Sequence, residues 1–402
     1  MPRIPEETIQ EILAAIDIVD VVGGYIPLKR AGTAYKALCP FHTEKTPSFT
    51  VNPARNTFHC FGCGAGGTAI RFVMDYENLP FGEAVRKLAD RAGVTIREEE
   101  YSAEEESKRA LRSRLIQAHQ AAAEWFHDLL LNSPAAKGAR DYLRGRGIGG
   151  EIARRWMIGY APDDTDLYRE WAESNGYSPK LLVAGGLLAL RDENNPSRGT
   201  YPKFRDRVMF PVKNDYGDYI AFSGRALRPD VPAKYMNSPE SPIFNKSKTF
   251  FGLDRTKRAI LKARCAIICE GQIDLVMCVE AGVENMVAPL GTAFTPDHAY
   301  SMKRHTDEVV LCYDSDTAGQ AAVEKAYALL AKAGISVRVA EIPEGEDPDS
   351  FLRAHGAEAF RALVENAREF FDYLIAAGAR KADLTSIAAK TQFSQKLVRH
   401  AR

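Results

Sequence analysis

The sequence contains no run of 18 apolar residues, which excludes a helix that spans a membrane. Its first residues, MPRIPEETIQEILAAIDIVD, carry proline and acidic side chains and lack the apolar core of a secretory signal. Cysteine is scarce, with 7 among 402 residues, an odd number that does not suggest a disulfide scaffold. We therefore expect a reducing cytoplasm, where closely spaced cysteines indicate a metal site more often than a disulfide.

A net charge is also missing, because 53 lysines and arginines balance 53 aspartates and glutamates. The charges are nevertheless unevenly distributed. Residues 198–264 hold 15 basic against 6 acidic residues, a net of +9, and residues 265–350 hold 5 against 15, a net of −10. A basic segment followed by an acidic one suggests a polyanion site beside a metal site. Two solvated faces of unlike charge would give the same pattern, and on charge alone this is the safer interpretation.

The length exceeds what one hydrophobic core usually serves, so we expect roughly two to four domains. Six glutamates between residues 98 and 106, with almost no apolar neighbours, are typical of a linker. The changes in composition predict a first domain at 1–97, a charged linker at 98–108, a basic subdomain at 109–264, an acidic subdomain at 265–350 and a helical segment at 351–402.

Two pairs of potential metal ligands lie in the stretch CPFHTEKTPSFTVNPARNTFHCFGC. Cys39 and His42 are spaced C-x2-H, and Cys60 and Cys63 are spaced C-x2-C. Such turns each supply two ligands to tetrahedral zinc, and the alternating residues between them read as a hairpin whose turn is NPARN. His59 is out of register with both pairs and is not expected to bind. The pattern predicts a zinc ribbon with one structural ion.

The ribbon is expected to lie among helices, at residues 6–26 with Gly23 and Gly24 as the stop, at 68–79 and at 81–94. Its exposed side chains would suit a nucleic-acid strand, because aromatic rings stack on bases and cations bind phosphates. The side chains expected in this role are Lys36, Lys45, Arg55, Phe49, Phe58 and Phe61.

The basic subdomain begins with an amphipathic helix at 109–131 and shorter helices within 139–148 and 151–162. Residues 200–227 read as a hairpin that turns at DYGD. Cations follow this region, and we expect them to contact nucleic acid or nucleotide, although a solvated strand edge is an equally good explanation. They are Lys203, Arg205 and Arg207 on one strand face, Arg225 after the next strand, and Lys234, Lys246 and Lys248 in loops.

Residues 265–350 alternate strand and helix patterns, which predicts a parallel sheet with right-handed crossovers. Glu270, Asp314, Asp316, Asp347 and Asp349 follow strand ends, at the edge where open sheets bind ligands. Hard oxygen ligands favour Mg²⁺ or Mn²⁺. Helix capping could explain Asp316 and Asp349 alone, but it does not explain five carboxylates at one edge. The remaining cysteines lie in apolar runs and are expected in the core: Cys265, Cys269, Cys278 and Cys312.

Taken together, these motifs resemble the bacterial replicative DNA primases of the DnaG type. The stretch CPFHTEKTPSF with FHCFGC is similar to the zinc-binding domain of that family, and FRDRVMFPV, FSGRAL, KYMNSPESPIF and TFFGL resemble its RNA polymerase domain. CEGQIDLV, YDSDTAG and EGEDPDSF look like its Toprim motifs. The matches run in family order to about residue 375. Gln272 departs from the family, which often has an aromatic residue there.

The resemblance implies site residues by position. It makes Glu270, Asp314 and Asp316 catalytic, and it assigns Arg225 and Lys234 to the template and nucleotide groove. Glu270 is either a further metal ligand or an acid–base group, and the sequence does not choose between them. The acidic metal-binding set implied by the resemblance is Glu270, Asp274, Asp314, Asp316, Asp347 and Asp349.

The resemblance also implies a fold and an activity. We expect a multidomain α+β and α/β chain with a zinc ribbon and flanking helices, a basic mixed subdomain, a parallel Toprim subdomain and a short helical end. The implied function is synthesis of RNA primers on single-stranded DNA from ribonucleoside triphosphates with Mg²⁺ or Mn²⁺. The family's partner is a hexameric replicative helicase, but the helical segment is expected to be incomplete and the helicase-docking domain absent. The alternatives are a Toprim nuclease or topoisomerase and a non-catalytic zinc and Toprim DNA clamp.

Overall fold

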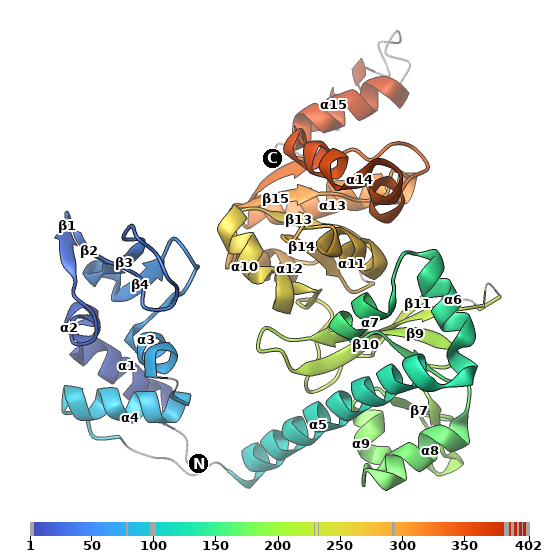
Figure 1. Ribbon diagram of the computed structural model, residues 1–402, viewed down its shortest axis with the longest axis horizontal. Coiled ribbons are helices and arrows are strands. Elements are labelled where there is room, and N and C mark those ends of the chain that lie inside the picture. The colour runs from blue at the N-terminus through green and yellow to red at the C-terminus, as the bar shows by residue number, and fades with distance from the viewer. Residues whose placement is uncertain are drawn as a thin grey trace. The chain divides into compact units, whose positions relative to one another are not determined.

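The computed structural model describes residues 4–77, 79–96, 102–228, 230–231, 233–291, 294–381, 386, 390–391, 394–395 and 397–398. The chain forms two compact units, Met1–Arg109 and Ala110–Arg402. In the described ranges, no helix is both long and apolar enough to cross a membrane. Figure 1 shows the elements of both units.

The first unit begins with two helices where the sequence predicts one. Helix α1 (Glu6–Ala15) ends at Ile16, which is extended, and α2 (Ile18–Gly23) begins after Asp17. The Asp17 carboxylate caps α2 by accepting a hydrogen bond from the Val19 N–H at 2.7 Å. The predicted helix over 6–26 is therefore wrong at this point, because a capping aspartate interrupts an apolar pattern that continues across it.

A five-stranded antiparallel sheet follows, in the order β1-β2-β3-β4-β5. The predicted hairpin is confirmed as β3 (Phe49–Asn52) and β4 (Thr57–Cys60), joined by the short helix Pro53–Arg55. The side chain of Asn56 in this turn donates to the Leu13 carbonyl and accepts from the Ile18 N–H, so the hairpin is tied to the break between α1 and α2. The other elements are β1 (Lys29–Ala31), β2 (Ala34–Ala37), β5 (Gly66–Gly67), α3 (Ala69–Glu77) and α4 (Phe81–Ala92).

The hairpin packs its aromatic side chains inward. Phe49 and Phe58 are fully buried and stack on each other, and Phe72 of α3 contacts both edge to face. The expectation that Phe49 and Phe58 are exposed is therefore wrong, whereas Phe61, just beyond the hairpin, is 62% exposed.

Helix α5 (Ala103–Asn132) leads into the second unit and is longer than the predicted helix at 109–131. Residues 103–108, which the sequence places in the linker, form its first turns, and residues 98–101 lie outside the described part of the chain. The helices that follow are α6 (Lys137–Gly145), α7 (Gly150–Trp156), α8 (Thr165–Ser174) and α9 (Pro179–Ala184).

An antiparallel sheet of four strands, in the order β11-β10-β9-β6, contains the second predicted hairpin. Asn214 shapes its turn, since its side-chain oxygen accepts from the N–H groups of Tyr216 and Asp218. Strand β9 begins only at Arg207, so Lys203 and Arg205 do not share its face as predicted. The strands are β6 (Gly159–Ala161), β9 (Arg207–Lys213), β10 (Tyr219–Ala226) and β11 (Tyr235–Asn237), while β7 (Leu188–Leu190) and β8 (Thr200–Pro202) pair separately.

The largest sheet has the order β12-β14-β13-β15-β16-β17, and its four inner strands are parallel as predicted, while both edge strands are antiparallel. The strands are β12 (Phe250–Phe251), β13 (Ala266–Ile268), β14 (Met286–Pro289), β15 (Glu308–Leu311), β16 (Ser336–Val339) and β17 (Arg368–Glu369). Its helices are α10 (Leu253–Ala263), α11 (Gln272–Glu280), α12 (Pro296–Lys303), α13 (Thr317–Lys332), α14 (Pro348–Glu365) and α15 (Phe370–Lys381).

The two larger sheets of the second unit share one hydrophobic core. Phe222 of β10, Leu275 of α11 and Phe360 of α14 belong to it, and a second core with Leu330 of α13 and Phe370 of α15 covers the opposite face of the parallel strands. Because close-packed cores resist displacement, the two sheets hold the loops between them in a fixed arrangement.

Candidate active site and metal centre

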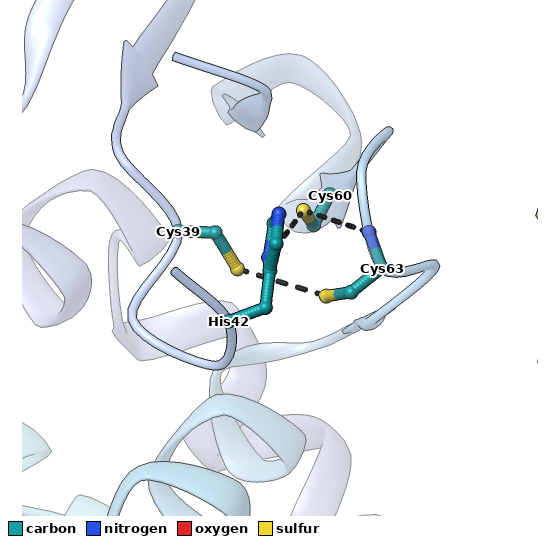
Figure 2. A group of neighbouring side chains, drawn as sticks. All are labelled: Cys39, His42, Cys60 and Cys63. Atoms are coloured by element: carbon teal, nitrogen blue, oxygen red, sulfur yellow. Dashed lines mark hydrogen bonds between the residues drawn. The ribbon is translucent and has the colours of Figure 1, made fainter. Parts of the chain in front are cut away.

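The four predicted zinc ligands converge at the tip of the ribbon, as Figure 2 shows. The sulfurs of Cys39 and Cys63 lie 3.7 Å apart, and the Cys60 sulfur lies 3.7 Å from Nδ1 of His42. A tetrahedral zinc ion with bonds of about 2.3 Å to sulfur and about 2.0–2.1 Å to nitrogen places two sulfurs about 3.8 Å apart and a sulfur and a nitrogen about 3.6 Å apart. The observed spacing therefore fits a zinc ion at this site.

A second layer of contacts orients these ligands. The carboxylate of Glu44 lies 3.2 Å from Nε2 of His42, which leaves Nδ1 as the nitrogen that faces Cys60. Although desolvation opposes the effect, hydrogen bonds from Ser48 and from the Cys39 N–H lower the pKa of Glu44. Glu44 is therefore an ionised partner for the histidine. Sequence reasoning missed it, although a carboxylate two residues after a ligand is a usable signal.

The thiol of Cys39 would need a neighbouring cation to ionise at neutral pH. Burial raises the pKa of Cys39 to about 12, so its thiol is protonated at neutral pH unless a positive ion offsets the cost. Gly62 allows the turn to close, because a Cβ there would lie 2.6 Å from Nε2 of His42. Within the described residues, these four ligands are the one group of three or more Cys, His, Asp and Glu side chains compact enough to hold a metal ion by themselves.

The outer surface of the ribbon has some of the exposed cations and aromatic rings that the sequence predicts. Lys36, Lys45 and Arg55 are exposed, and Phe61 lies beside the ring of His59 with centroids 4.7 Å apart. Leu38, which is 51% exposed, joins them, whereas the two buried phenylalanines do not. The predicted stacking surface is therefore smaller than expected and depends on Phe61.

Four of the six predicted carboxylates line a pocket of about 250 Å³ at the carboxyl ends of the parallel strands. Glu270 follows β13, Asp274 lies in the first turn of α11, Asp314 follows β15 and Asp347 caps α14. Gln272 at the start of α11 also lines this pocket.

The pKa values of three of these acids, Glu270, Asp274 and Asp314, are raised by burial and by neighbouring carboxylates. Burial, together with the charges of Asp314 and Asp316, raises the pKa of Glu270 to about 7, although part of this side chain stays accessible to solvent. Burial and then the charges of Asp347 and Asp314 raise the pKa of Asp274 to about 7. One oxygen of Asp314, Oδ1, is buried and has no hydrogen-bond partner among the described residues. Neighbouring carboxylates with an unpaired buried oxygen fit a divalent cation, which removes both the repulsion and the unmet interaction.

Asp316 and Asp347 also cap helices. Oδ1 of Asp316 accepts from the Gly319 N–H at 2.7 Å, and Oδ1 of Asp347 accepts from the Ser350 N–H at 2.6 Å. Each still has a second oxygen for another partner. Asp316 lies outside the smaller pocket and lines an adjoining hollow of about 920 Å³ together with Asp314 and Asp347.

Asp349 does not belong to the pocket lining. Its side chain is fully buried and forms ion pairs with Arg146 at 2.9 Å and with Arg353 at 3.1 Å. The predicted role of Asp349 as a metal ligand stays a prediction, and in this structure each of its oxygens pairs with an arginine.

Of the predicted cations, Arg225 and Lys234 line the pocket beside the carboxylates. The Arg225 guanidinium lies 5.4 Å from the ring of Tyr142 and 5.1 Å from that of Tyr235, while its Nε has no hydrogen-bond partner in the described part of the chain. Sequence reasoning missed three further polar residues in the lining, Arg146, Tyr235 and Asn237.

The other predicted cations lie elsewhere. Arg207 is buried and donates to the carbonyls of Gly224 and Ala233, so it serves the sheet and cannot reach a polyanion. Lys203, Arg205 and Lys246 are outside the pocket lining. The remaining cysteines are core residues as predicted, with Cys269, Cys278 and Cys312 buried and Cys265 half-buried.

Three family models match the chain in succession. A CHC2 zinc finger model matches residues 4–104, the N-terminal domain of the DNA primase catalytic core matches residues 125–257, and a Toprim-like model matches residues 267–352. The DNA primase of Listeria monocytogenes is 39% identical over 373 residues, which are 92% of this chain and 59% of that protein. The chain thus spans 59% of the length of this relative.

Solved structures agree with the family models. The Aquifex aeolicus primase structure with zinc-binding and RNA polymerase domains is 34% identical, with a TM-score of 0.60, and the match covers 98% of this chain and 92% of that one. A structure of the DnaG primase catalytic domain bound to ssDNA is 32% identical, with a TM-score of 0.59, over 72% of this chain and 94% of that one. The Cys39, His42, Cys60 and Cys63 site is accordingly a zinc site, and the chain belongs to the DnaG-type DNA primase family, with a CHC2 zinc finger, a primase catalytic core and a Toprim-like domain.

Proposed function

We propose that this chain is a DNA-dependent RNA polymerase that makes short RNA primers on single-stranded DNA for replication. One observation carries the proposal: acids and cations line the same pocket of the second unit. The lining includes Glu270, Asp274, Asp314 and Asp347 together with Arg146, Arg225 and Lys234. A triphosphate needs both, since its oxygens bind divalent cations held by carboxylates and also bind guanidinium and ammonium groups.

In the proposed reaction, the 3′-hydroxyl of one ribonucleotide attacks the α-phosphorus of the next. The new bond joins the 3′-oxygen to phosphorus, the bond to pyrophosphate breaks, and the hydroxyl proton leaves to solvent or to a carboxylate of the site. Mg²⁺ or Mn²⁺, bound by Asp314 with Asp347, Asp316 or Glu270, would lower the barrier by offsetting charge on the attacking and leaving oxygens. Arg225 and Lys234 would orient the phosphates, and the carboxylates would position the cations. These oxygens are less closely grouped than the zinc ligands, which suits Mg²⁺ because it retains waters and takes phosphate oxygens as ligands.

The template is proposed to be single-stranded DNA. The support is the related catalytic domain that was solved bound to ssDNA, together with the exposed Phe61, Lys36 and Lys45 on the ribbon. An exposed aromatic ring among cations can stack on a base without reading its identity. In this proposal the ribbon holds the template strand and helps to choose the start site.

The deciding experiment is primer synthesis on single-stranded DNA with labelled ribonucleotides and Mg²⁺ or Mn²⁺. Short RNA products that require both template and metal are the expected result. Cleavage or relaxation of DNA without RNA products would favour the nuclease or topoisomerase alternative. DNA binding without any reaction would favour the non-catalytic clamp.

A further inference from the structure

Asp349 differs from every other acid near the pocket because it is fully buried and doubly paired. Its Oδ2 accepts from Nη1 of Arg146 at 2.9 Å, and its Oδ1 accepts from Nε of Arg353 at 3.1 Å. This carboxylate is fully buried, has an arginine on each oxygen and lies outside the pocket lining. Asp349 is therefore suited to hold an arginine side chain in place, because charge-assisted hydrogen bonds of this kind are geometrically specific.

The anchored arginine reaches the pocket from the end of a helix. Arg146 follows the last turn of α6, and its N–H bonds to the carbonyls of Tyr142 and Leu143, so its backbone is fixed. Gly147, at φ 79°, completes the turn against α11, where a Cβ would lie 3.2 Å from Cε of Met277. The side chain is 30% exposed and lines the pocket together with Asp274 and Asp314.

Most of the Arg146 guanidinium is left for a ligand. Within the described residues, the Nη1 bond to Asp349 is its one side-chain hydrogen bond, and a guanidinium carries five N–H donors. Arg146 and Arg225 flank the same ring of Tyr142, at 6.0 Å and 5.4 Å. Two guanidinium groups held about one aromatic ring form a pair of planar, preorganised donors, which suits phosphate oxygens better than flexible lysines do.

From these contacts we infer that Asp349 is a positioning residue and not a metal ligand, and that it holds Arg146 as a phosphate-binding residue of the pocket. The ligand is the triphosphate of the incoming nucleotide, so this inference rests on the proposed function and specifies a further part of its substrate site. Asp349 acts through Arg146. Its negative charge offsets the free-energy cost of desolvating the arginine, and its hydrogen bond fixes the orientation of the guanidinium group.

Two binding measurements on the zinc-loaded chain test the inference without relying on catalysis. The first is Mn²⁺ affinity, followed by electron paramagnetic resonance. Asp349→Asn should keep Mn²⁺ affinity within about threefold of wild type, whereas Asp314→Asn should lower it by about tenfold or more, because only Asp314 offers an oxygen to the ion. A loss of Mn²⁺ affinity in Asp349→Asn as large as that in Asp314→Asn would overturn the inference.

The second measurement is the affinity for ATP and for inorganic tripolyphosphate, each with Mn²⁺, by calorimetry. Arg146→Gln should weaken both by about tenfold, in line with one charge-assisted hydrogen bond, and Arg146→Lys should recover only part of the loss. Asp349→Asn should weaken both by a similar factor, and the double variant should be no weaker than either single variant. Losses that multiply in the double variant would show that Asp349 does not act through Arg146.

The matched control is Arg353→Gln, which breaks the other ion pair of Asp349 and does not line the pocket. It should leave ATP and tripolyphosphate affinity unchanged. If Asp349→Asn fails to fold, the two Arg146 variants decide: unchanged ATP and tripolyphosphate affinity overturns the inference. Weakened single-stranded DNA binding in Arg146→Gln with intact ATP affinity would assign the arginine to the template phosphates and would also overturn it. A wild type that binds Mn²⁺ and ATP but makes no primer would defeat the proposed function and leave this inference standing.

Discussion

The zinc ribbon and the carboxylate pocket both gather groups that bind cations, but they do so over different distances in the chain. The ribbon takes all four ligands from residues 39–63, two from each of two tight turns. The pocket takes its acids from the ends of separate parallel strands, so Glu270 and Asp347 meet only because the sheet is folded. The ribbon can therefore be recognised from spacing, whereas the pocket has to be recognised from topology.

The two regions also differ in how fully the protein itself surrounds the ion. The four ribbon ligands are spaced for one tetrahedral ion and leave no position open, which is typical of a structural site. In the pocket the acids are more widely placed, and burial together with mutual repulsion raises the pKa of Glu270 and Asp274 to about 7. In the proposed function, such a site would take its last ligands and its charge balance from the substrate. The comparison predicts that damage to the pocket affects the reaction, whereas damage to the ribbon affects the fold of its own unit.

The largest effect is expected from Asp314→Asn. The variant keeps the shape of the side chain but removes the negative charge of an acid that lines the pocket. Primer synthesis should fall by roughly three orders of magnitude, because metal-bound charge stabilisation accounts for several kcal/mol of the barrier. Single-stranded DNA affinity and the thermal transition of the chain should change little. Near-normal synthesis would remove the metal-assisted mechanism.

Cys60→Ser tests the other half of the comparison. Three ligands hold zinc much less well than four, and zinc binding supplies much of the folding free energy of so small a unit. The zinc content should fall from about one ion per chain to near zero, and the ribbon should lose its protection from protease while the unit from Ala110 onward keeps its own. The control is Cys265→Ser, a half-buried core cysteine outside the ribbon, which should keep the zinc. A wild-type chain without zinc would refute the site.

A smaller change at the same site is Glu44→Gln. The amide can still accept from the backbone but no longer offers a charged acceptor to Nε2 of His42. Zinc affinity, measured by competition with a chromophoric chelator, should drop by about tenfold to a hundredfold. Glu83→Gln, on the exposed face of α4, is the matched control and should have no effect. An unchanged affinity in Glu44→Gln would mean that the carboxylate does not orient the ligand.

The pocket should respond to pH in the absence of divalent metal. The pKa of Asp274 is about 7 in the folded chain, above its unfolded value, so the folded state binds the extra proton between these two values. Its contribution to stability is therefore present at low pH and is lost as the pH rises through about 7. In zinc-loaded, magnesium-free buffer, Asp274→Asn should raise the free energy of unfolding at pH 8 by roughly 1–2 kcal/mol and have little effect at pH 5. A destabilised Asp274→Asn at pH 8 would show that the acid is not repelled by its neighbours.

Much of the fold could be predicted because its signals are local. The β3–β4 hairpin, the alternation of strand and helix in residues 265–350 and the zinc spacing each lie within one short segment. The errors arose where local pattern and packing disagree. The alternation of apolar and polar residues in the hairpin indicated two faces, but not which face packs against a helix. In the structure, Phe72 of α3 packs against Phe49 and Phe58 and buries them.

The site was harder to predict, because the charge of a residue does not indicate which group it contacts in the folded chain. Arg207 carries the same charge as Arg225, yet it donates to two carbonyls inside the sheet. Asp349 shares a motif with Asp347, yet its partner Arg146 lies 203 residues earlier in the chain. No spacing rule connects such residues, and only the folded chain shows that one acid faces the pocket and the other holds an arginine.

The smallest expected effect is that of Lys234→Ala. This variant tests whether Lys234 binds a phosphate in the pocket or only contributes to the positive charge of residues 198–264. Lys234 is exposed at the pocket edge and its charge acts on Asp314, whereas Lys246 of the same basic segment lies outside the lining. If Lys234 binds a phosphate, its loss should weaken nucleic-acid or nucleotide binding severalfold and reduce the slope of log affinity against log salt by about one. Lys246→Ala changes the net charge equally and should leave both quantities almost unchanged. Equal effects of the two variants would mean that the basic segment acts as a general field, and Lys234 would lose its place in the site.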